Sequence, residues 1–219
     1  MTADKLVAMT HLPPFHAPEP TLPAKILDFW LSDGLALGWP TQNLNERWFR
    51  GGAALDREIN DRFGPDVRLA VQGGLQDWET PLHSRLALLI LLDQFTRNVF
   101  RGTGQAFDGD TRAQQLALQT LAHAEDRQLS WVGRVFIYMP LMHAEDRALQ
   151  VKSVDSFSQL LADAPAALKP KLQGNLDFAH QHHGIITRFG RFPYRNAALG
   201  RISTPEEIDF LRTGPRFGQ

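Results

Sequence analysis

The 219-residue sequence predicts an all-α protein, and three observations lead to this prediction. Apolar residues recur at intervals of three to four along most of the chain, which places them on one face of a helix. No segment alternates apolar and polar residues in the manner of a half-buried strand. Glycine and proline interrupt the periodic stretches, so we expect about eight or nine helices joined by short loops. Short connections favour antiparallel neighbours, in a bundle or a stack of helical hairpins.

The first expected helices lie in the N-terminal third of the chain. Residues 23–31 place apolar side chains on one face, and Pro23 suits a helix start. Two short amphipathic helices follow in the segments 44–50 and 55–63, and Gly64-Pro65 is expected to end the second. Another helix should begin at residue 66 and end at the glycine pair 73–74.

The most apolar helix is expected from Pro81 to about Phe100. Its segment LALLILL, residues 86–92, is apolar on every side, which is typical of a central helix surrounded by protein. This apolar run is far shorter than the roughly 20 residues that span a bilayer. We therefore expect a cytoplasmic protein with no membrane partner.

The C-terminal half adds helices near residue 110 and over 131–140, 143–163, 171–189 and 204–212. Thr204, Pro205 and Glu207 have the spacing of a helix capping box.

The string HAEDR occurs twice, but its flanking sequences differ, so we interpret the identity as coincidence. No linker divides the chain. We expect a flexible proline-rich arm over residues 1–21 and a single all-helical domain over 22–219.

Composition excludes several classes of function. The 23 basic and 24 acidic residues nearly balance, so no global field favours nucleic acid as a partner. The absence of cysteine excludes disulfides, thiolate catalysis and cysteine-based metal sites. Phosphate-loop, dinucleotide, nucleophile-elbow and zinc-protease motifs are also missing, and we expect no cofactor and no metal.

Polar side chains crowd the end of the central helix, in the segment LLDQFTRNVFRGT. Asp93, Arg97 and Arg101 lie four residues apart on one face, with the acid before the bases in the favourable order. Gln94 and Asn98 form a parallel polar row. Buried donors need partners, so this row is either a salt-bridge network that ties helices together or the floor of an anion pocket.

A second polar group follows Pro140 in the segment YMPLMHAEDRALQ. His143 and Asp146 are three residues apart near an expected helix start, a spacing that suits a chelated metal or a base with its orienting acid. In the alternative, structural interpretation, Glu145 and Asp146 complement the dipole of the helix N-terminus. Both interpretations stay open.

Histidines gather in the segment HQHHGIITRFGRFPYRN, residues 180–196. Helical periodicity separates them, because His182 and His183 fall on apolar faces whereas His180 faces the polar side with Asp177. A three-ligand metal site is therefore not expected. A core histidine hydrogen-bonded to a neighbour fits the pattern better.

The segment RFGRFPYRNAALGRIS is rich in arginine but cannot form one helix, because Gly190 and Pro193 interrupt it. Four guanidiniums in irregular backbone indicate an ordered, well-bonded loop. They either bind helix C-terminal carbonyls or line an anion-binding hollow with Arg97 and Arg101. The four are Arg188, Arg191, Arg195 and Arg201.

Four motifs in this order, ILDFWL, LLDQFTRNVFRGT, YMPLMHAEDRALQ and RFGRFPYRNAALGR, resemble the bacterial "domain of unknown function 924" family. The resemblance runs from about residue 22 to the terminal PEEIDFL. It implies a helical, tetratricopeptide-repeat-like fold and no established activity. The family's motif positions fall on Asp93, Gln94, Arg97, Asn98, Arg101, His143, Glu145, Asp146, His182, Arg188, Arg191, Arg195 and Arg201.

The chain departs from the family's usual pattern at three positions. Thr96 stands where proline is usual, Met142 where glutamate is usual, and Tyr194 where histidine is usual. Losing a glutamate and a histidine removes groups that a mechanism would use as acid, base or ligand. The departures favour structure or binding over catalysis.

The leading hypothesis is a non-catalytic binding or scaffold protein with an arginine-rich pocket between helices for an anionic small molecule or peptide. Its expected contacts are Arg97, Arg101, Arg188, Arg191 and Arg195, with Asn98 and Asn196 orienting them. The competing hypothesis is a hydrolase-like enzyme. It would use His143 or His182 as general base, Asp146 as orienter, and the arginines for developing negative charge.

Overall fold

The computed structural model describes residues 20–215, and every regular element within this range is helical, which confirms the all-α class. The expected proline-rich arm falls almost entirely on residues that lie outside this range. Helical segments outnumber the eight or nine expected, because the loops contain short additional turns. The N-terminal elements are α1 (Leu22–Leu31), α2 (Gly34–Leu37), α3 (Asn45–Phe49), α4 (Ala53–Val71) and η1 (Gln76–Trp78).

The break expected at Gly64-Pro65 is wrong, because α4 continues through both residues to Val71. A proline inside a helix leaves the carbonyl four residues earlier without its N–H partner. Here that carbonyl belongs to Asp61 on the exposed face, where water can serve it. On the opposite face Phe63 and Val67 are buried on either side of the proline, and their packing favours one continuous helix.

The central helix runs without interruption through α5 (Leu82–Leu89), the π-helical turn η2 (Ile90–Phe95) and α6 (Thr96–Val99). All residues from 86 to 92 are at most 1% exposed, which confirms the predicted central position. The wide turn carries Asp93 and Gln94, and such turns are frequent where functional side chains gather. Thr96 supports the turn by donating its hydroxyl to the Leu92 carbonyl at 2.8 Å.

The remaining elements are η3 (Gly104–Phe107), α7 (Asp110–Ala122), η4 (Glu125–Gln128), α8 (Trp131–Met142), α9 (Arg147–Asp163), α10 (Lys169–Phe189), η5 (Pro193–Arg195) and α11 (Pro205–Thr213). The helix expected from residue 143 begins at Arg147 instead. At α11 the predicted capping box is confirmed, since Thr204 and Glu207 each accept from the other's backbone N–H.

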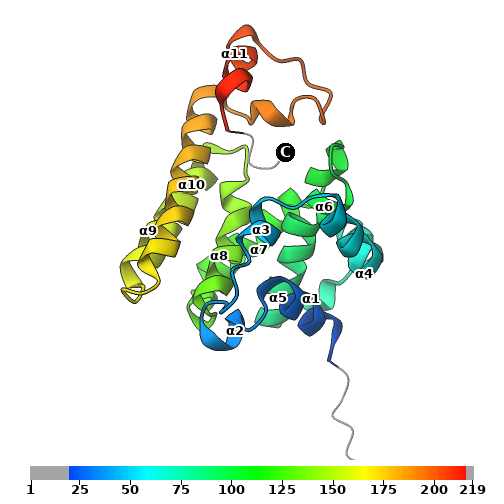
Figure 1. Cartoon of the computed structure of the whole chain (residues 1–219), viewed down its shortest axis with the longest axis vertical. Helices are drawn as coiled ribbons and strands as arrows, with labels where there is room; N and C mark the ends of the chain where they lie inside the picture. Colours follow the sequence, from blue (N-terminus) through cyan, green and yellow to red (C-terminus); the bar gives the residue numbers. More distant parts are fainter. Residues whose placement is uncertain (1–19, 216–219) are drawn as a thin grey trace, which may run out of the picture.

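Helices α9 and α10 form a long antiparallel hairpin along one side of the molecule, and α8 packs against α9 (Figure 1). Helix α4 lies on the opposite side, and α5 lies between (Figure 1). After α10 the chain passes over one end of the helices through η5 to α11 (Figure 1). We call this segment, residues 190–204, the arch. A regular superhelix of repeated hairpins stays a prediction. Among the described helices none is long and apolar enough to cross a membrane.

An aromatic cluster joins α1, α3, the central helix and α8. Trp30 is 1% exposed and meets Phe95 edge-on, with ring centroids 5.2 Å apart. Trp48 contacts Phe136 at the same centroid distance of 5.2 Å, and its Nε1 donates to the Trp30 carbonyl at 2.8 Å. Edge-to-face packing of this kind fixes the rings relative to one another. The cluster therefore forms a rigid base for the cavity described next.

Candidate functional site

A cavity of about 160 Å³ opens where α1, α3, α8, α10, η5 and the end of the central helix meet. Five arginines line it: Arg47, Arg50, Arg97, Arg101 and Arg195. Aromatic rings form much of the remaining wall: Trp30, Trp48, Phe49, Phe178 and Tyr194. Within residues 20–215 no aspartate or glutamate lines the cavity itself. Its surface therefore combines positive charge with flat apolar faces.

His143 and Asp93 form a buried pair at the inner end of the cavity. Nδ1 of His143 lies 2.8 and 3.1 Å from the two Asp93 carboxylate oxygens, and the Asp93 side chain is 2% exposed. Gln94 Nε2 donates to the same carboxylate at 2.5 Å, and Arg97 Nη2 lies 3.4 Å away. Burial alone would raise the pKa of Asp93, but the charges of His143 and Arg97 hold it well below its usual range.

The loop after α8 fixes the backbone of His143. Arg195 Nη2 donates to the His143 carbonyl at 3.0 Å. On the other side of the loop the fully buried Gln150 donates through Nε2 to the carbonyls of Met142 at 2.6 Å and Ala144 at 2.8 Å. These bonds satisfy carbonyls at the end of α8 that have no helical partner. The imidazole is thus held by its ring and by its main chain.

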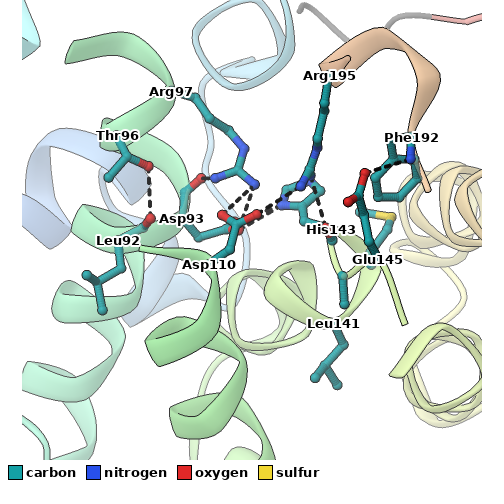
Figure 2. A network of polar contacts seen from close by, with 12 residues as sticks. Leu92, Asp93, Thr96, Arg97, Asp110, Leu141, His143, Glu145, Phe192 and Arg195 are labelled. Atoms are coloured by element: carbon teal, nitrogen blue, oxygen red, sulfur yellow. Dashed lines mark hydrogen bonds and ion pairs between the residues drawn. The ribbon is translucent and has the colours of Figure 1, made fainter. Parts of the chain in front are cut away.

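Asp110, the first residue of α7, joins two buried guanidiniums. Its Oδ1 lies 3.0 Å from Arg97 Nη2, and its Oδ2 accepts from Arg195 Nη1 at 3.0 Å. Figure 2 shows Arg97 and Arg195 reaching this carboxylate from different elements, with His143 beside it. Arg97 also donates to the main-chain carbonyl of Asp93. Arg97 and Arg195 line the cavity, whereas the acids that pair with them, Asp93 and Asp110, do not.

His182 lies next to His143 but in a different electrostatic environment. The two ring centroids are 5.8 Å apart, and His182 is 3% exposed. Its Nδ1 lies 2.8 Å from the Phe178 carbonyl within α10. Burial, together with the neighbouring charge on His143, lowers the pKa of His182 to about 3, so the imidazole is neutral near pH 7. This is the buried, hydrogen-bonded histidine that the sequence favoured.

Arg101 and Asn98 lie at the outer part of the cavity and share one acid. Asp56 of α4 accepts from Arg101 Nε at 2.7 Å and Nη2 at 2.8 Å, and from Asn98 Nδ2 at 2.8 Å. These bonds hold the pKa of Asp56 below its usual value, although burial alone would raise it. Both side chains therefore keep fixed positions at the rim.

Arg47 differs from the other lining arginines. It is half-buried, donates to the Phe29 carbonyl, and lies 4.7 Å from the centroid of the Phe29 ring. Among residues 20–215 it has no carboxylate within 4 Å. No carboxylate of residues 20–215 therefore neutralises the positive charge of Arg47.

Two buried N–H groups on lining residues have neither a hydrogen-bond acceptor nor an ion-pair partner among the described residues. They are Nε1 of Trp30, whose residue is 1% exposed, and Nε of Arg195, whose residue is 5% exposed. A buried donor without an acceptor costs about 1–3 kcal/mol. Both donors belong to residues that line the same cavity.

Three arginines and one asparagine of the predicted site lie outside the cavity: Arg188 in the last turn of α10, and Arg191, Asn196 and Arg201 in the arch that follows it. Arg188 pairs with Glu206 at 2.8 Å, and Arg191 binds Glu207 through two bonds of 2.6 and 2.8 Å. Asn196 Nδ2 donates to Ser203 Oγ at 3.0 Å. Arg201 makes a two-pronged pair with Glu145. The Glu145 carboxylate also accepts from the Phe192 N–H, as Figure 2 shows. These groups attach the arch to the helices.

Asp146 does not orient His143, contrary to the expectation from their spacing. Its carboxylate accepts from the Leu149 N–H at 2.8 Å and caps α9. Because the chain turns between His143 and Asp146, the three-residue spacing does not put them on one helix face. The orienting acid is Asp93, which lies 50 residues away in sequence. Within the described residues no group of three or more potential metal ligands occurs.

The sequence singled out Arg97, Asn98, Arg101, His143, His182 and Arg195, and the structure brings these six to one cavity. It did not indicate Asp110, Asp56 or Arg47. Asp110 stood at an expected helix start, where an acid is ordinary, so only its contacts reveal its role. Two of the family departures, Met142 and Tyr194, both line the cavity.

Fold and site together define an all-helical protein with a cationic, aromatic-walled cavity at the end of its central helix. The model of the family described as "Bacterial protein of unknown function (DUF924)" matches residues 26–215, and the chain belongs to this family. A protein of unknown function from Agrobacterium tumefaciens has a similar structure, with a TM-score of 0.72 and 37% identity. The alignment covers 88% of this chain and 98% of that one. No curated protein matches the chain.

Proposed function

We propose that this protein binds a small organic anion, a carboxylate with a flat apolar body, in the central cavity. The observation that carries the proposal is the lining itself: five arginines line the space, and no carboxylate of residues 20–215 does. A site lined by one sign of charge attracts the opposite sign, and guanidiniums suit the two oxygens of a carboxylate.

The ion pairs that the lining arginines make with aspartates indicate which arginine would bind the anion. Arg97, Arg101 and Arg195 already share their charge with Asp93, Asp56 and Asp110. Among residues 20–215 Arg47 has no such partner, so its charge is the one that a bound carboxylate would neutralise. The unsatisfied N–H groups of Trp30 and Arg195 provide further donors.

The walls and the volume limit the body of the ligand. Trp48, Phe49 and Phe178 present aromatic faces, and the Phe49 and Phe178 rings lie 6.1 Å apart between α3 and α10. Flat apolar groups pack well on such faces. At roughly 10–15 Å³ for each enclosed water, a cavity of about 160 Å³ corresponds to on the order of ten heavy atoms. Benzoate and its simple derivatives have this size and shape, whereas a folded partner does not fit.

The test is titration calorimetry with benzoate and with cyclohexylmethanol, an uncharged apolar molecule of similar size. We expect benzoate to bind and to raise the melting temperature, and the alcohol to bind at least tenfold more weakly. Arg47→Gln should weaken benzoate binding by about tenfold, since a charged hydrogen bond contributes about 1.5–3 kcal/mol. Arg188→Gln is the matched control, because Arg188 is exposed, does not line the cavity and pairs with Glu206 of α11.

Two results would contradict the proposal. One is equal affinity for benzoate and the neutral alcohol, which would mean that the arginines play no part in recognition. The other is an equal loss of binding in the Arg47 and Arg188 variants, which would place the anion on the surface. Circular dichroism of both variants checks that each keeps the parental fold.

A further inference from the structure

We propose that the cavity is hydrolytic, with His143 as the general base, Asp93 as its positioning residue, and a small aryl ester that carries a free carboxylate as the substrate. This inference rests on the proposed function, because the carboxylate is what would hold the ester in the cavity. It replaces the acid that the sequence suggested, Asp146, by an acid from the central helix.

The first argument is the direction of the imidazole. An ionised carboxylate only accepts hydrogen bonds, so the 2.8 Å contact with Asp93 places the imidazole proton on Nδ1 of His143. In the neutral form of this imidazole, which is the form that can act as a base, Nε2 carries the lone pair. Because His143 lines the cavity while Asp93 lies behind it, the basic nitrogen is the one available to a bound molecule.

The second argument separates His143 from His182. His143 has a full negative charge beside its ring, which stabilises the imidazolium that forms when Nε2 takes a proton. The Nδ1 contact of His182 is a main-chain carbonyl, and its ring packs against Phe192 with centroids 5.5 Å apart. The groups around the pair are Asp93, Arg97, Asp110, Tyr194 and Arg195, and the cations among them disfavour a second proton on His182.

The third argument concerns the negative charge that develops during ester hydrolysis. Arg195 donates to the His143 carbonyl at 3.0 Å, so its guanidinium lies beside the base. Its Nε–H is buried without an acceptor among the described residues. A fixed donor of this kind stabilises an oxyanion more than a neutral carbonyl, which lowers the barrier.

The chemical step needs only water as co-reactant. Water donates one proton to Nε2 of His143 while its oxygen forms a bond to the ester carbonyl carbon, and the carbonyl electrons move onto oxygen near Arg195. The carbonyl re-forms, the bond to the aryloxy oxygen breaks, and that oxygen takes the proton from His143. The products are a carboxylic acid and a phenol, and the base returns to its neutral form.

The test uses the purified full chain and 4-acetoxybenzoate, whose hydrolysis gives acetate and 4-hydroxybenzoate. We expect turnover that exceeds the uncatalysed rate and that competes with added benzoate. Phenyl acetate, which lacks the carboxylate, should have a kcat/KM at least tenfold lower. His143→Gln should lower kcat by about 100-fold with little change in KM, as general bases typically contribute 10²–10⁴. His180→Gln is the matched control, because His180 is exposed and does not line the cavity.

Asp93 is tested by readouts that a merely structural role would not move. Asp93→Asn should lower kcat more than it changes KM for 4-acetoxybenzoate and should alter the pH profile, because the tautomer of His143 is no longer fixed. If Asp93→Asn fails to fold, His143→Ala provides the alternative measurement. Free imidazole should restore part of its activity, since the cavity would accept the missing base.

Failure of this inference is distinguishable from failure of the proposed function. Benzoate binding that persists in the absence of His143-dependent hydrolysis would overturn the catalytic proposal and leave the binding proposal standing. Hydrolysis that is equal in the His143→Gln and His180→Gln variants would also overturn it. Loss of both benzoate binding and hydrolysis in a folded parent protein would overturn both.

Discussion

Arg195 Nη1 lies 3.0 Å from Asp110 Oδ2, although 85 residues separate the two in sequence. The same carboxylate faces Arg97 at 3.0 Å. Asp110 therefore joins the arch after α10 to the end of the central helix, and it holds two buried guanidiniums close together against their mutual repulsion. The position of the cavity wall depends on this one acid.

Asp110→Asn should lower the free energy of unfolding by about 3 kcal/mol, because removing one partner leaves buried charges uncompensated. Urea denaturation followed by circular dichroism measures the change. Asp108→Asn, two residues away at an exposed position, is the matched control and should change stability by less than about 0.5 kcal/mol. Equal effects of the two substitutions would show that Asp110 does not hold the arginines.

His182 should make stability depend on pH in a defined direction. Its pKa is lowered to about 3 in the folded protein, whereas an unfolded histidine titrates near 6.5, so the unfolded state binds the extra proton between these values. The free energy of unfolding is therefore highest above about pH 6.5 and falls as the pH is lowered. The slope approaches about 1.4 kcal/mol per pH unit.

The measurement is urea denaturation between pH 5 and 6.5, where the carboxylates with lowered pKa values, such as Glu207, still keep their charge. His182→Gln should reduce the slope, and His180→Gln should leave it unchanged, since His180 is exposed. A parental slope that survives in His182→Gln would contradict the assignment. The measurement tests both the sign and the size of the pH dependence of stability.

Glu207 should control the stability of the arch and α11. It is 2% exposed, binds Arg191 through both oxygens and completes the capping box with Thr204. Glu207→Gln should reduce the protection of α11 amides from hydrogen exchange by about tenfold, since charged hydrogen bonds and caps each contribute about 1–2 kcal/mol. Glu206→Gln, one residue earlier and exposed, should have little effect. Uniform loss of protection throughout the protein would contradict a local role.

Gln150 should stabilise the loop that carries His143. Gln150→Leu removes the donor from the carbonyls of Met142 and Ala144, and two buried acceptors without partners should lower the free energy of unfolding by about 2 kcal/mol. Thermal denaturation gives the change. Gln159→Leu, at an exposed position of the same helix, is the control. If both variants have the melting temperature of the parent protein, the loop does not depend on these hydrogen bonds.

The repeated string HAEDR illustrates the limit of local sequence. In the first copy Asp126 is buried and accepts from the Tyr138 hydroxyl at 2.5 Å. In the second copy Glu145 binds Arg201, and Asp146 caps α9. The same five-residue sequence thus makes different contacts in its two copies, because the hydrogen-bond partners come from distant parts of the chain.

Much of the secondary structure followed from local pattern. The central helix, the helix faces of α10 and the capping box at Thr204 depend on residues within one or two turns, so spacing alone predicts them. The predicted break at Gly64-Pro65 failed for the opposite reason. Packing of Phe63 and Val67 against the core decides that α4 continues, and no local rule contains that packing.

The sequence by itself determined the all-α class, the buried position of residues 86–92 and the polar row that ends the central helix. Only the tertiary structure decided which partner each polar group has: Asp93 for His143, Asp110 for Arg97 and Arg195, and Glu207 for Arg191. The physical reason is that helical periodicity shows which face of a helix turns inward, but not which other helix it meets. The partner of each charged side chain depends on which other helix lies next to it, and only the tertiary structure decides this.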